Sequence, residues 1–141
     1  MIINADITLY NSYVDDMERT KYKKTIIKGV NWQGAVTKMI TNNTLQSADS
    51  INVFIPFLAD FSGKTYLEPK EWFKLSESAK DNYFTFKATD RIVKGQCDFE
   101  FIGINTVKNL DNSYDNVISI MSVVKNDNGS PSMQHFMIGG K

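Results

Sequence analysis

The sequence is poor in the side chains that most often carry chemistry, with one cysteine, one histidine and three prolines in 141 residues. A single cysteine excludes an internal disulfide and any metal site built from several thiolates. Cys97 alternates with Phe99 and Phe101, which predicts a small buried residue on the apolar face of a strand. As a nucleophile Cys97 would need a basic partner, and His135 is the only histidine in the sequence.

The sequence also lacks an excess of charge and any long apolar run. Its 16 basic and 16 acidic residues cancel, whereas nucleic-acid binding depends on a basic surface that neutralises phosphates. The apolar stretch at 53–59 falls far short of the roughly 20 residues that cross a bilayer. The N-terminus reaches Asp6 with no basic residue before it. We therefore expect no membrane insertion, no secretion by a signal peptide and no general nucleic-acid binding.

What the sequence has in excess is β-branched residues. It contains 14 Ile and 9 Val against 6 Leu and 6 Ala. β-branched side chains lose rotamer freedom in helices and pack well on pleated sheets. The length suits one domain rather than two. We therefore predict a single, mainly β (α+β) domain over residues 1–141, folded as a small antiparallel β-barrel or curled sheet with one or two short helical insertions.

Alternating apolar residues and turn signals predict the strands. Gly29 interrupts a strand pattern and indicates a bulge or a tight bend, and Pro56 indicates that its end of a strand lies at an edge or a bulge. Asn128-Gly129 marks the turn of the closing hairpin. The predicted strands are 7–13 and 22–32, which form a hairpin, then 36–40, 51–57, 90–95 and 97–104, and finally the pair 117–124 and 133–138.

Two segments depart from the strand pattern. Residues 68–84 are predicted as a helical insertion, because Pro69 suits a first helical position and Ser76 suits an N-cap. A second short helix is predicted over 106–114, with Thr106 as its cap. Residues 41–50 are polar and carry no apolar period, which predicts an exposed loop.

No pattern in the sequence indicates catalysis. It has neither a glycine-rich phosphate loop nor a nucleophile elbow, and one histidine cannot supply the pair of a HExxH zinc site. His135 is interpreted as a hydrogen-bonded strand residue, and Asp98 with Glu100 as the solvated side of a strand. We expect no catalytic, cofactor-binding or metal-ligating residues, and therefore no enzyme.

One binding function stays open as an alternative. A barrel of the oligonucleotide-binding type could stack bases of a single-stranded nucleic acid on exposed aromatic rings. A small binding module of this kind could also recognise a host protein. The candidate stacking residues are Tyr10, Trp32, Phe54 and Phe86.

Several segments together resemble a family of small uncharacterised proteins encoded by phages and prophages of low-GC Gram-positive bacteria. The segments that carry the resemblance are ADITLYN at 5–11, IKGVNWQG at 27–34, SADS at 47–50, VFIPF at 53–57, YLEPKEW at 66–72, DRIVKG at 90–95 and GSPSMQHF at 129–136. The resemblance covers nearly the whole chain. It implies a family without an established activity.

The chain is also similar to the head–tail connector proteins (head-completion or stopper proteins) of long-tailed phages. The similarity lies in the initial hairpin, the Ile-Pro-Phe step at 55–57 and the Ile-Val-Lys-Gly strand at 92–95. It implies a non-enzymatic virion protein that assembles as a ring, with portal-side and tail-side virion proteins as partners. Such a protein occupies the host cytoplasm during assembly and then the virion. The 41–50 segment is the candidate mobile element, and the 68–84 insertion exceeds the simplest connector pattern.

Overall fold

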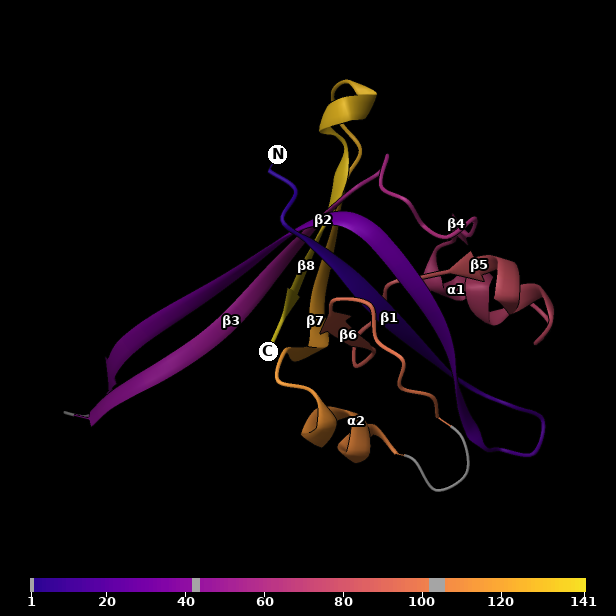
Figure 1. The fold of residues 1–141 in the computed structure, drawn as a ribbon, viewed down its shortest axis with the longest axis horizontal. Helices are drawn as coiled ribbons and strands as arrows, with labels where there is room; N and C mark the ends of the chain where they lie inside the picture. The colour runs from indigo at the N-terminus through magenta and orange to yellow at the C-terminus, as the bar shows by residue number, and fades with distance from the viewer. Residues whose placement is uncertain (1, 42–43, 102–105) are drawn as a thin grey trace.

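The computed structural model describes residues 2–41, 44–101 and 106–141. Six antiparallel strands close into an uneven barrel in the order β1-β2-β3-β8-β7-β6. Figure 1 labels these strands on the ribbon. Their lengths range from 4 to 22 residues, so long hairpins project beyond the closed part. The strands are β1 (Ala5–Val14), β2 (Thr20–Thr41), β3 (Thr44–Pro56), β6 (Arg91–Lys94), β7 (Val117–Asn126) and β8 (His135–Gly140). The prediction of a mainly β fold with a small antiparallel barrel is confirmed.

The first hairpin pairs β1 with β2 from Asp6 opposite Lys28 to Val14 opposite Thr20. Gly29 forms the predicted bulge: the register shifts between Ala5 and Asp6, and Gly29 has a φ of +88°, which favours glycine. The Gly29 N–H donates to the Asp6 carboxylate at 3.1 Å. The bulge lies where β2 leaves β1, and it bends the sheet toward closure.

The barrel core consists of inward-facing residues at alternate positions of the strands. On β3, for example, Val53 and Ile55 are fully buried, while Phe54 between them is partly exposed. The same period holds for Ile118 and Ile120 on β7. The large side chains of this core that are at most 1% exposed include Ile7, Leu9, Ile27, Ile55, Phe84, Phe86, Ile92, Ile118, Ile120 and Ile138.

The helical insertion covers one end of the barrel. It comprises β4 (Thr65–Tyr66), α1 (Pro69–Phe73), a 3₁₀ helix over Ala79–Asn82 and β5 (Tyr83–Phe84), which pairs in parallel with β4. Pro69 begins α1 as predicted. Ser76 makes the predicted N-cap hydrogen bond: its hydroxyl accepts from the Ala79 N–H at 3.2 Å, and its carbonyl accepts from the Lys80 N–H at 3.0 Å. Ser78 directly precedes the 3₁₀ helix, but its side chain makes no cap hydrogen bond.

The second helix, α2 (Val107–Ser113), begins after Thr106 as predicted. The Asn109 side chain accepts a hydrogen bond from the Thr106 N–H at 3.2 Å, which satisfies a free donor at this helix end. Leu110 is fully buried and belongs to a small second core with Tyr10, Val93 and Cys97. This core anchors α2 to the outside of the barrel.

Two sequence predictions need correction. The exposed loop predicted at 41–50 is wrong over 44–50, because these residues begin β3 and pair with the end of β2. A hairpin that projects from the barrel needs no apolar face, so its polar composition was misleading. The strand predicted at 97–104 is wrong over 97–101, where the chain is irregular. The Cys97 N–H donates to the Thr8 hydroxyl at 2.9 Å in place of a strand partner. Residues 42–43 and 102–104 lie outside the described residues.

Candidate functional site

The feature that distinguishes this barrel is the long β2–β3 hairpin, which we call the arm (residues 35–50). β2 pairs with β1 up to Val30 and with β3 from Asn31 onward. On the other side, β8 pairs with β3 only from Ile51 to Pro56. Over the arm, β2 and β3 therefore pair only with each other among the described residues. Figure 1 shows the arm extending away from the rest of the barrel.

The side chain of Asn4 lies just beyond the point where β1 stops pairing with β2, near the start of the arm. Its amide pairs with the backbone of Trp32 as a further strand would: the Trp32 N–H donates to Asn4 Oδ1 at 2.8 Å, and Asn4 Nδ2 donates to the Trp32 carbonyl at 3.1 Å. Along a strand, the backbone N–H and C=O groups of successive residues point alternately to its two sides. Beyond Trp32, the backbone groups of the even-numbered residues from 34 to 40 therefore lie on the free edge of β2. Those of the odd-numbered residues from 45 to 49 lie on the free edge of β3. Unpaired strand edges are templates for another chain.

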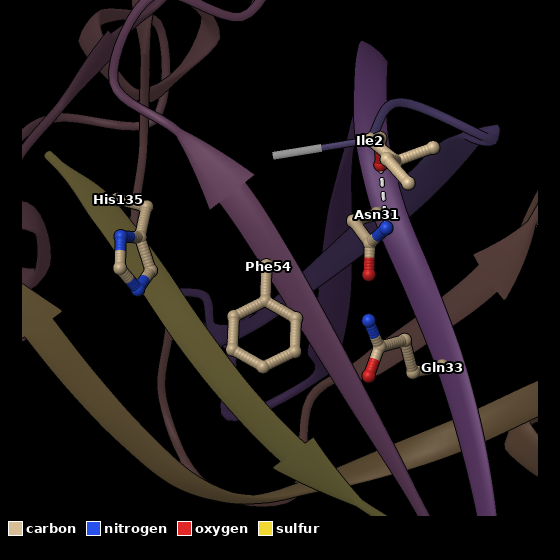
Figure 2. Close-up of a pocket in the computed structure, with 5 residues that line it drawn as sticks. All are labelled: Ile2, Asn31, Gln33, Phe54 and His135. Atoms are coloured by element: carbon tan, nitrogen blue, oxygen red, sulfur yellow. Dashed lines mark hydrogen bonds between the residues drawn. The ribbon is translucent and has the colours of Figure 1, made fainter. Parts of the chain in front are cut away.

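A pocket of about 310 Å³ lies at the base of the arm, on the outer face of β2, β3 and β8 (Figure 2). Its wall contains no charged side chain: the lining residues are Ile2, Asn31, Gln33, Phe54 and His135. Asn31 donates to the Ile2 carbonyl, while its own Oδ1 is buried without a hydrogen-bond partner in the part of the chain that the structure describes. The pocket is neutral and shallow, and its walls suit contacts with a partner better than chemistry.

The imidazole of His135 is held by hydrogen bonds on both nitrogens. Nδ1 lies 3.0 Å from the Met133 carbonyl, which can only accept, so Nδ1 carries the proton. Nε2 then accepts from the Asn126 side-chain amide at 3.0 Å. The prediction of a hydrogen-bonded strand residue is confirmed. Because both nitrogens are hydrogen-bonded, only the face of the imidazole ring is left to contact a ligand. The centroid of this ring lies 5.8 Å from that of Phe54.

The surroundings of Cys97 do not suit a nucleophile. The thiol accepts a hydrogen bond from the Tyr10 hydroxyl at 3.2 Å and is 3% exposed, so the predicted burial is confirmed. Its partners lie on β1 and in its own segment, whereas the partners of His135 lie on β7 and in the turn before β8. Burial also raises the pKa of Tyr10 well above its usual range. Asp98 and Glu100 are exposed, as predicted.

Three of the four candidate stacking residues are unavailable to a base. Tyr10, Trp32 and Phe86 are buried in the two cores, with at most 8% of the surface of any one of them exposed. Only Phe54 presents its ring at the surface, in the pocket of Figure 2. The stacking prediction is therefore wrong for Tyr10, Trp32 and Phe86. Alternation alone could not separate inner from outer aromatic residues before the register of each strand was known.

A second pocket, of about 330 Å³, lies between the loop after β3, β4 and the β7–β8 hairpin, and we call it the aromatic socket. Aromatic rings line this pocket. The ring centroid of Phe136 lies 4.6 Å from that of Tyr66 and 4.7 Å from that of Phe57, and both pairs are tilted. The pKa of Tyr66 is raised to about 12, mainly by burial and next by the nearby Glu68 carboxylate. Lys64 and Lys125 also line the socket, and burial lowers the pKa of Lys64. Sequence reasoning did not find this pocket, because its residues come from separate segments.

Other searches of the described residues were negative. Nowhere in the described ranges do three or more His, Cys, Asp or Glu side chains come together in a way that could hold a metal ion. No helix in the described part of the chain is long and apolar enough to span a membrane.

These features define a closed antiparallel β-barrel with a projecting arm and two neutral or aromatic surface pockets. A model for a family of unknown function (DUF6751) matches residues 2–141, and the chain belongs to this family. No curated protein and no solved structure matches the chain. The expectation of a family without an established activity is confirmed, whereas its phage origin stays a prediction.

Proposed function

We propose that this protein is a non-enzymatic structural protein of a phage or prophage virion, which acts at the head–tail connector by assembling with copies of itself and with neighbouring virion proteins. The observation that supports this most is the arm. An isolated two-stranded hairpin is marginally stable in water, and this one has two unpaired edges. A neighbouring subunit that pairs with an edge or packs on the arm would supply the missing contacts.

The pockets support the same proposal. Neither the pocket at the base of the arm nor the aromatic socket combines a nucleophile, a free base and an acid. His135 has both nitrogens engaged, and Cys97 is buried in another part of the molecule. A surface that offers strand edges, flat rings and neutral amides suits assembly with proteins. The resemblance to connector proteins supplies the virion context.

Two measurements test the proposal. Particles induced from a genome that encodes the protein are purified, and their proteins are identified by mass spectrometry. We expect the protein in the particle, with immunogold label at the junction of head and tail. A particle that lacks the protein, although the infected cell expresses it, would overturn the proposal.

A variant without the arm tests the part that the arm plays. Ala35 and Ser50 face each other across the hairpin, so a two-residue Asn-Gly turn can join them in place of 36–49. All core side chains that the structure describes lie outside the replaced segment, so we expect the variant to fold. We expect it to be excluded from particles, while a control with Met121→Ser, an exposed position on β7, is incorporated normally. Normal incorporation of the armless variant would contradict the role of the arm.

A further inference from the structure

The turn between β1 and β2 presents two apolar side chains to solvent on a hydrogen-bonded frame. Val14 is 63% exposed and Met17 is 73% exposed. Asp15 holds the frame, because its carboxylate accepts from the backbone N–H groups of Met17 at 2.9 Å and Arg19 at 2.8 Å. Glu18 adopts a φ of +59°, as a tight turn requires. We call residues 14–18 the tip.

The tip and the aromatic socket are complementary in chemistry. The tip carries the exposed acidic residues Asp16 and Glu18 beside Met17, whose sulfur accepts from the Arg19 guanidinium at 3.4 Å. Lys125 at the socket is 42% exposed and pairs with Glu68 at 3.4 Å, whereas the Lys64 ammonium donates to the Lys24 carbonyl at 2.6 Å. Methionine makes favourable contacts with aromatic rings through its polarizable sulfur. Opposite charges around an apolar contact favour one orientation and reject others.

We propose that the tip of one copy of this chain docks in the aromatic socket of a second copy, with Met17 over the rings and Glu18 near Lys125. The choice of a second copy as partner rests on the assembly function proposed above. The tip and the socket are separate surfaces of one chain, as Figure 1 shows from the positions of the β1–β2 turn and β4. Such a contact is heterologous, so it repeats from copy to copy and gives a ring when the rotation closes.

Disulfide trapping tests the contact, because it captures even weak association. The variant with both Met17→Cys and Thr65→Cys carries one thiol on the tip and one at the socket. Cys97 is 3% exposed and does not compete. We expect oxidation of the purified full chain to give a ladder of dimers, trimers and higher species. Met17→Cys alone should stop at dimers, and the matched control with Met121→Cys and Thr65→Cys should give several-fold less ladder. A ladder no stronger than that of the control would overturn the proposal.

Charge reversal in the double-cysteine variant tests the orientation of the contact. Glu18→Lys alone and Lys125→Glu alone should each reduce the ladder several-fold, because each places like charges together. The two reversals combined should restore it, and added salt should weaken the ladder of the unreversed variant. A combined variant no better than the single reversals would refute the pairing of Glu18 with Lys125.

The failure of this contact is distinguishable from the failure of the proposed function. A protein found in the virion that forms no ladder retains the connector function and loses the tip–socket contact. A protein that forms the ladder but is absent from the particle keeps the contact and loses the virion function.

Discussion

The ammonium group of Lys87 forms an ion pair with the carboxylate of Asp90, whose side chain has no exposed surface. Other donors complete the shell of this carboxylate: Asn11 Nδ2 lies 2.8 Å away, and the Ser12 hydroxyl lies 2.9 Å away. A buried charge is stable only when it is paired and hydrogen-bonded. This cluster ties the loop before β6 to the middle of β1, and β1–β6 pairing is one of the contacts that close the barrel.

Removal of this carboxylate should therefore be costly. We expect Asp90→Ala to lower the free energy of unfolding by about 3–5 kcal/mol, because it leaves the half-buried Lys87 ammonium without its counter-ion and removes one acceptor of the Asn11 amide. Asp111→Ala is the control: Asp111 pairs with Arg91 at 3.2 Å but is 41% exposed, so its loss should cost less than about 1 kcal/mol. Chemical denaturation measures both, and equal effects would contradict the importance of burial.

Leu110 should account for most of the attachment of α2. We expect Leu110→Ala to cost about 2–5 kcal/mol, because it leaves a cavity between α2 and the side chains of Tyr10 and Val93. Lys108→Ala, on the exposed side of the same helix, should change stability by no more than about 0.5 kcal/mol. Urea titration followed by tryptophan fluorescence measures the difference between the two variants.

Two glycines, Gly140 on β8 and Gly34 on β2, should respond in opposite directions to replacement by alanine. A Cβ at Gly140 would lie 2.7 Å from the Ser119 carbonyl oxygen and 2.8 Å from Ile118 Cδ1, so Gly140→Ala should destabilise the protein by about 1–3 kcal/mol. A Cβ at Gly34 meets nothing within 4 Å, and Gly34→Ala should stabilise by about 0.5–1 kcal/mol. Thermal unfolding distinguishes them. A neutral Gly140→Ala would show that β7 and β8 can separate locally.

The contact between Tyr13 and Glu77 should be visible in a pH titration. The Tyr13 hydroxyl donates to Glu77 Oε1 at 2.7 Å, and this bond, followed by one from Lys21, holds the pKa of Glu77 below its ordinary value of 4.5. The stabilisation is fully present above the unfolded-state pKa and is lost as the pH falls through the lower folded-state pKa. We expect Tyr13→Phe to raise the pKa of Glu77 toward 4.5, as followed by carboxyl NMR shifts. An unchanged pKa would assign the shift to Lys21 alone.

Local features of the fold were predictable because they depend on neighbours in sequence. Gly29 needs a positive φ at a bulge, Pro69 suits a first helical turn, and Thr106 suits a cap. The alternation of Val53 and Ile55 with Phe54 likewise identified a half-buried strand. Each of these signals depends only on residues a few positions away, so it can be recognised in a single sequence.

The closure of the barrel and the candidate site were not predictable in the same way. Pairing of β1 with β6 joins residues more than 80 positions apart, and the sequence carries no local mark of it. The strand at 36–40 was predicted, but its partner at 44–50 was missed, because projecting strands need no buried face. The aromatic socket combines Phe57, Tyr66 and Phe136 from three segments. Burial of Trp32 depends on which face of the closed sheet it occupies, and burial of Phe86 depends on how the segment between β5 and β6 packs on the core.

A single strand connects the two surfaces to which we assign contacts. β2 starts directly after the tip and runs for 22 residues into the arm, a path of about 70 Å at roughly 3.3 Å per residue. Its backbone passes from pairing with β1 to pairing with β3 without a break. If both proposed contacts form, a load applied to the arm by one neighbour would pass along this one strand to the tip held by another. Subunits joined in this way would bear strain in series.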